Sequence, residues 1–224
     1  MPRHLTLTLV LIITLIGSTA VQAGPIVPRP LASGLDGEYS NLGPAGENHQ
    51  QVADVFVLAH AATLQSLTWY GRYDTDSGAA GSAGPFGFEV RIFGDSDGSP
   101  AITPTWVKNE SVNANGAGTG YLGLPWLTYT MALPDWSLGA GTYWLSIVED
   151  HDPTTPAGNT QWLWGDTAAA GMRAIRGQDG AVWTVSSDTS HAFTLVGTVP
   201  DPGSSLLLLG IGLAGLRAWR GRRG

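Results

Sequence analysis

Short runs of apolar and polar residues, separated by turn-forming residues, cover the middle of the chain. In residues 86–92 (FGFEVRI), aromatic and β-branched side chains take every second position, which predicts a half-buried strand. Residues 52–58 (VADVFVL) are apolar at nearly every position except Asp54, which favours a strand buried on both faces. The middle of the chain is therefore predicted to be β-structure.

Similar runs recur along the chain, with clusters of Gly, Pro, Asn and Asp between them. The further strands that we expect are Thr63–Tyr73, Thr105–Asn113, Tyr121–Met131, Thr142–Glu149, Gln161–Trp164, Gly171–Arg176, Ala181–Ser186 and Ala192–Gly197. Roughly ten short strands bounded by turns are typical of an all-β fold, here a single β-sandwich of the jelly-roll type. No linker divides residues 50–197, so we expect one ectodomain over residues 49–198. Residues 24–48 contain four prolines and are expected as an extended leading segment with at most one early strand.

The N-terminus has the three parts of a secretory signal peptide. A basic residue stands near the start, residues 5–16 form an apolar run, and residues 21–23 (VQA) resemble the site that signal peptidase cleaves. We therefore expect residues 1–23 to be a signal peptide that is cut between Ala23 and Gly24. The alternative, an uncleaved membrane anchor, is disfavoured because the apolar run is short for a bilayer span.

The C-terminus, residues 199–224, also has three parts: a proline-rich motif, an apolar run at about residues 204–219, and a basic tail over residues 217–224. The residues concerned are Val199, Pro200, Asp201 and Pro202 in the motif and Arg217, Arg220, Arg222 and Arg223 in the tail. As a transmembrane helix the apolar run would be about 24 Å long, against a hydrocarbon core of ~30 Å. The arginines would stop transfer and keep the C-terminus in the cytoplasm, with the body outside. The two prolines keep the chain before the span extended, as a protease substrate must be.

These three parts, in this order, resemble the PEP-CTERM sorting signal, in which a Val-Pro-Glu-Pro-like motif precedes a short transmembrane helix and an arginine-rich end. Asp201 stands where glutamate is usual and keeps the carboxylate on a shorter stem. The resemblance implies a Gram-negative bacterium that makes exopolysaccharide, export through the inner membrane and transient anchoring there. It also implies processing by an exosortase-type membrane protease, before release to the cell surface or the extracellular matrix. The alternative is a plain anchor that is never cut.

The net charge and the lack of cysteine argue against several classes of partner and of chemistry. Residues 24–199 contain six basic and 17 acidic residues, a formal charge of −11. Such a body repels nucleic acid and anionic membranes, so we expect no nucleic-acid partner. The chain has no cysteine, which excludes disulfides, cysteine-ligated zinc and a thiol nucleophile.

Two acidic segments have some features of metal sites. Asp95 and Asp97 are followed by Gly98, as in a calcium loop, but the further oxygen ligands of an EF-hand are missing. A hairpin turn explains these residues better, so a Ca²⁺ site is the weaker alternative and no cofactor is expected. Residues 150–152 (DHD) follow the end of a predicted strand and are better explained as a solvated loop.

Candidate chemistry in the body is sparse. The sequence has no nucleophile elbow, metalloprotease helix or phosphate-binding loop. Glu89 and Glu149 are carboxylates of the kind that a glycoside hydrolase uses, but both lie on predicted strands without a specific context. Trp162 and Trp164 share one face of their predicted strand. On an exposed face they would form a sugar-stacking glycan platform, whereas on a buried face they would fill the core, which is the commoner outcome.

The body also looks like a recurring ectodomain of exported proteins that carry this tail. The shared elements are Asp54-Val55-Phe56, Trp69-Tyr70-Gly71, Gly141-Thr142-Tyr143-Trp144, Trp162-Leu163-Trp164 and Ala192-Phe193-Thr194-Leu195. This resemblance implies no known activity. We expect a non-enzymatic structural or adhesive protein of the cell envelope or matrix. The alternative is a glycan-binding module or a glycan-acting hydrolase of the exopolysaccharide (biofilm) matrix.

Overall fold

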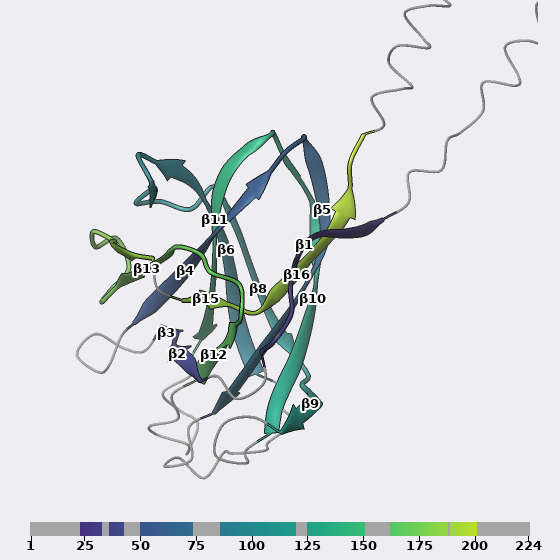
Figure 1. Cartoon of the computed structure of the whole chain (residues 1–224), viewed down its shortest axis with the longest axis vertical. Coiled ribbons are helices and arrows are strands. Elements are labelled where there is room, and N and C mark those ends of the chain that lie inside the picture. The colour runs from purple at the N-terminus through teal and green to yellow at the C-terminus, as the bar shows by residue number, and fades with distance from the viewer. Residues whose placement is uncertain are drawn as a thin grey trace, which may run out of the picture. The chain divides into compact units, whose positions relative to one another are not determined.

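Two β-sheets build the body in the computed structural model (Figure 1). The structure describes residues 23–32, 36–42, 50–73, 86–119, 125–150, 162–187 and 189–200. Ala23–Val199 form one compact unit, and the regular elements among its described residues are all strands. In the same ranges there is no helix with the length and hydropathy that a membrane span needs.

The first sheet contains the N-terminal and C-terminal strands of the body. Its strands are β1 (Gly24–Arg29), β2 (Gly37–Tyr39), β5 (Ala62–Tyr73), β9 (Asn115–Thr119), β10 (Pro125–Leu138), β12 (Trp162–Thr167), β15 (Ser190–His191) and β16 (Phe193–Thr198). Five of them follow the order β1-β16-β5-β10-β9, and β12 pairs with β5, β2 and β15. The pairs along this order are antiparallel.

The second sheet is built from the segments between these strands. Its members are β3 (Asn41–Leu42), β4 (Gln51–Leu58), β6 (Phe86–Ser96), β7 (Ser99–Pro100), β8 (Trp106–Val112), β11 (Gly141–Asp150), β13 (Arg173–Arg176) and β14 (Thr184–Ser186). The order is β14-β13-β4-β11-β6-β7, with β3 beside β11 and β8 beside β6. The chain crosses between the sheets several times, so each sheet contains segments from most of the length of the body.

The all-β prediction is confirmed, and the two sheets fit the expected sandwich. The expectation for residues 24–48 differs from the structure, because this segment contributes β1, β2 and β3 to the sheets. Pro25 and Pro28 lie on β1, which is an edge strand where the missing N–H of proline is tolerated. Residues 1–22 of the expected signal peptide (residues 1–23) and the expected C-terminal helix lie outside the described residues.

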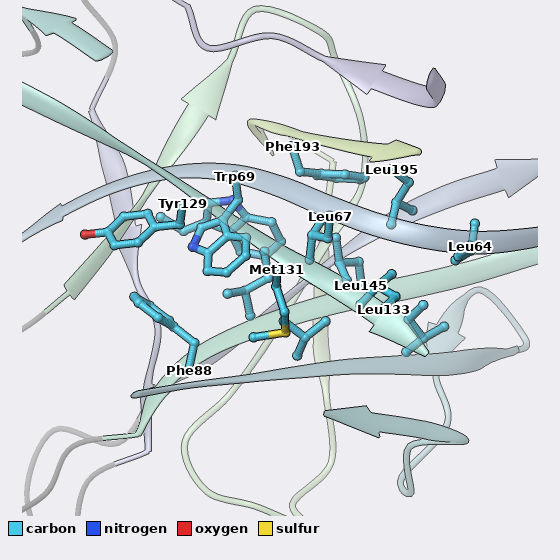
Figure 2. Packing of buried hydrophobic residues seen from close by; sticks show 14 of the residues in the cluster. Leu64, Leu67, Trp69, Phe88, Tyr129, Met131, Leu133, Leu145, Phe193 and Leu195 are labelled. Carbon is cyan, nitrogen blue, oxygen red and sulfur yellow. The ribbon is translucent and has the colours of Figure 1, made fainter. Parts of the chain in front are cut away.

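Aromatic rings pack against one another in the main core, beside aliphatic side chains (Figure 2). The Trp69 and Tyr129 rings stack at 5.5 Å between centroids, and both come from the first sheet. Phe88 from the second sheet packs edge-on against Trp69 at 5.3 Å and Tyr129 at 4.9 Å. The alternation of the sequence explains this packing, since every second residue of β6 and β10 points inward.

A second apolar cluster lies on the other face of the second sheet. Its buried members are Ala53, Val55, Phe93, Trp144, Ala174 and Trp183. The strand that the sequence predicts to be buried on both faces is therefore found, with seven of its eight positions in β4 buried. The guanidinium of Arg176 covers this cluster and lies 4.3 Å from the centroid of the Trp183 ring.

We predict that Gly71→Ala destabilises the body by about 1–3 kcal/mol, because the added methyl overpacks the core. A Cβ at Gly71 would lie 2.3 Å from Cζ2 of Trp162. Gly94→Ala is the matched control, since a Cβ there meets nothing within 4 Å. Urea unfolding of the residue 24–199 fragment measures both variants, and equal midpoints would contradict the prediction.

Candidate functional site

The strongest functional feature of the described residues is the edge formed by β1 and β16. The two strands are antiparallel, and Gly24 lies opposite Gly197. Partners in such a pair have Cα atoms about 5 Å apart. The first residue after the expected signal-peptide cut and the last strand before the proline-rich motif therefore share one end of one sheet.

A glycine lets β16 pass close to its neighbours at this end. A Cβ at Gly197 would lie 2.1 Å from the carbonyl oxygen of Thr63, and the pairing of β16 with β5 shifts register here. The strand ends at Thr198, and Val199 and Pro200 are exposed directly after it. The motif thus begins without a spacer at the end of a folded strand. Its Asp201 and Pro202, together with the arginines of the tail, lie outside the described residues.

Comparison with known protein families confirms the interpretation of the C-terminus. Residues 198–223 match the PEP-CTERM protein-sorting motif. The chain therefore carries a signal for sorting by exosortase, which is a membrane protein. This signal supports export of the chain and its transient anchoring through the C-terminus. No curated protein matches the chain.

The exposed glycan platform at Trp162 and Trp164 is wrong, and the core alternative is confirmed. Both side chains are fully buried, and both point from β12 into the main core. Trp164 stacks on the His191 ring at 4.8 Å between centroids and donates its Nε1–H to the Ala192 carbonyl oxygen at 3.1 Å. The two-residue spacing does place both indoles on one face, but that face is the inner one.

The acidic segment around Asp95 forms the predicted hairpin turn. Asp97 and Gly98 connect β6 to β7 and have φ angles of 54° and 80°, a conformation typical of a primed turn. The Asp95 carboxylate accepts hydrogen bonds from the Trp144 Nε1–H at 2.8 Å and the Gly98 N–H at 3.2 Å. Across the described ranges, no three His, Asp or Glu side chains come together as a metal site. Residues 151 and 152 lie outside these ranges.

Glu89 and Glu149 do not form a two-carboxylate site. Glu89 pairs with Val148 across β6 and β11, so Glu149, the next residue of β11, faces the opposite side of the sheet. Glu89 forms an ion pair with Arg91, whereas Glu149 is buried and accepts the Tyr73 hydroxyl proton in a hydrogen bond of 2.9 Å. Two carboxylates on opposite faces cannot flank one glycosidic bond.

The structure reveals a buried charge network that the sequence did not. Asp54 on β4 is fully buried, and its carboxylate accepts hydrogen bonds from the Arg29 guanidinium and from Nδ1 of His191 at 2.9 Å. Arg29 lies on β1 and His191 on β15, so the network joins the two sheets. The signal in the sequence was Asp54, an acid within an otherwise apolar strand.

Asp166 borders this network on its outer side. Its carboxylate lies 3.8 Å from Nε2 of His191. Burial raises the pKa of Asp166 to about 6, against the lowering effect of His191 and Arg173. Glu38 on β2 and Asp36 add a smaller raising effect. Asp54 contacts one nitrogen of the buried His191 ring and Asp166 lies near the other, so the imidazole contributes to the packing of the fold.

We predict that Asp166→Asn becomes more stable relative to the wild type as the pH rises. The raised pKa means that the folded state binds a proton at Asp166 more tightly than the unfolded state does. Protonation therefore stabilises the wild-type fold at low pH, and this contribution is lost between about pH 4 and about pH 6.5. The asparagine variant does not titrate, and the difference in unfolding free energy should shift by about 2 kcal/mol in its favour. Urea unfolding at several pH values tests this. Asp97→Asn, at an exposed turn, should show no such shift.

Proposed function

We propose that the chain is an exosortase substrate whose β-sandwich body has a non-enzymatic, structural or adhesive role at the cell surface or in the extracellular matrix. The observation that carries the proposal is that the PEP-CTERM motif begins at Thr198, the last residue of β16. Because no spacer separates the sorting signal from β16, the protein that the signal sorts is the whole β-sandwich body.

Both proposed cuts spare the sandwich. Signal peptidase would cut after Ala23, immediately before β1 begins at Gly24, and exosortase would read the motif over residues 199–202, after β16 ends. The fragment left between them keeps every described strand. Processing at both ends therefore leaves the β1–β16 pairing intact and releases a complete body.

The charges of the described residues support a role without catalysis. Asp54 is used to join the sheets, Glu149 is hydrogen-bonded in the core, and Arg176 covers the second apolar cluster. Side chains engaged in this way maintain the fold and are not presented to a substrate. A glycoside hydrolase needs two carboxylates on either side of the bond that it cleaves, and Glu89 and Glu149 do not provide such a pair.

We predict that the double variant Pro200→Ala, Pro202→Ala blocks processing, because the extended conformation that prolines impose before the span is lost. With an epitope tag after Gly224 in the native host, the wild-type body should lose the tag and leave the inner-membrane fraction. The double variant should keep the tag and stay in that fraction.

Pro134→Ala, a substitution at an exposed proline of β10, is the control and should be processed like the wild type. Immunoblotting of membrane and surface fractions with an antibody against the body reads out all three proteins. A wild-type protein that reaches the surface with its C-terminal tag intact would contradict exosortase processing.

A further inference from the structure

The outward face of the first sheet carries a regular array of uncharged hydroxyl groups. We call it the threonine face and define it by Ser66, Thr68 and Tyr70 of β5, Thr128 and Thr130 of β10, and Thr194 of β16. These positions alternate with the buried residues of the same strands, so their side chains lie on the outward face, where Thr130 is exposed and the other five are half-buried. The three strands lie side by side (Figure 1).

The strand register aligns the hydroxyl groups in rows. Thr194 pairs with Thr68, and Thr68 pairs with Thr130, so three threonines form one row across three neighbouring strands. The Oγ1 atoms of Thr68 and Thr130 are 3.1 Å apart, within hydrogen-bond distance. In the next row Tyr70 lies opposite Thr128. Hydroxyl groups thus repeat at about 4.8 Å across the strands, and rows repeat at about 6.7 Å along them.

The neutrality of this face contrasts with the rest of the body. Residues 24–199 have a formal charge of −11, yet the six residues of the threonine face include no Asp, Glu, Lys or Arg. The outward face of the second sheet, in comparison, carries the ion pairs of Arg91 with Glu89 and Asp179. The six residues therefore form an uncharged region of this sheet face. Beyond that region, Arg72, two residues after Tyr70 on β5, forms an ion pair with Asp36.

We propose that the threonine face binds a neutral polysaccharide. A threonine hydroxyl both donates and accepts a hydrogen bond, as sugar hydroxyls do, and the Tyr70 ring can stack on a sugar ring. The β-branched threonines are stiff at χ1, so ordering them on binding costs little entropy. A broad sheet face suits an extended polymer, whereas small ligands bind in concave pockets.

Charge and composition disfavour other occupants. An anionic polymer would meet the repulsive field of the acidic body. Protein interfaces concentrate their binding energy in Trp, Tyr and Arg, and Ser and Thr are under-represented among such residues. The inference deepens the proposed function and rests on it for the biological setting, but the binding assay needs no sorting or processing.

The test is co-sedimentation of the purified residue 24–199 fragment, which contains the compact unit, with insoluble β-glucan, α-glucan and chitin. The triple variant Thr68→Val, Thr130→Val, Thr194→Val removes three hydroxyl groups at nearly constant shape. We expect it to bind at least tenfold more weakly than the wild type. Thr105→Val, Thr142→Val, Thr184→Val removes three hydroxyl groups outside the threonine face and should bind like the wild type. Circular dichroism and urea unfolding establish that all three proteins are folded.

Three results would overturn the proposal. One is retention of the wild type on calcium alginate, an anionic polymer, but on none of the neutral polymers. Another is equal binding by the triple variant and the wild type. The last is a dimer in light scattering that the triple variant abolishes, without binding to any polysaccharide, which would make the face a contact between two copies. None of these results bears on C-terminal processing, which the tagged protein tests separately.

Discussion

The pairing of β16 with β1 on one side and β5 on the other is the constraint on which the body depends. The last strand of the chain's body is an inner strand of the first sheet, and its partners are the first strand and a strand more than a hundred residues earlier. Closing such distant contacts costs loop entropy before the contacts form. The first sheet therefore cannot be complete until Phe193–Thr198 have been exported, and the sorting motif follows at once.

The buried charge network makes the arrangement of the two sheets specific. Burying Asp54 costs desolvation energy that an apolar residue would avoid, so the network adds little net stability. Its value is geometric, because the carboxylate is satisfied only when Arg29 of β1 and His191 of β15 reach β4 together. A packing of the sheets in another register would leave a buried charge without partners, which is strongly unfavourable.

The sequence predicted the interior better than the edges and the site. Alternation located the long central strands, and the apolar run over residues 52–58 correctly indicated burial on both faces. It missed β1 because prolines at an edge strand look like those of a loop, and it missed β15 because two residues carry no periodicity. The Asp54–His191 contact joins positions 137 residues apart, so no local pattern could show it. The sorting motif was predictable because its three parts are contiguous.

The absence of cysteine accounts for the burial of tryptophans that could otherwise have formed a binding surface. An exported body without disulfides must obtain its stability from packing, and large aromatic side chains bury the most apolar area per residue. In the described residues, Trp69, Trp144, Trp162 and Trp164 are accordingly fully buried. Recognition at the surface then falls to residues that the core does not need. On the outward face of the first sheet these are threonines, whose β-branched shape stabilises a strand while the hydroxyl group stays available to a ligand.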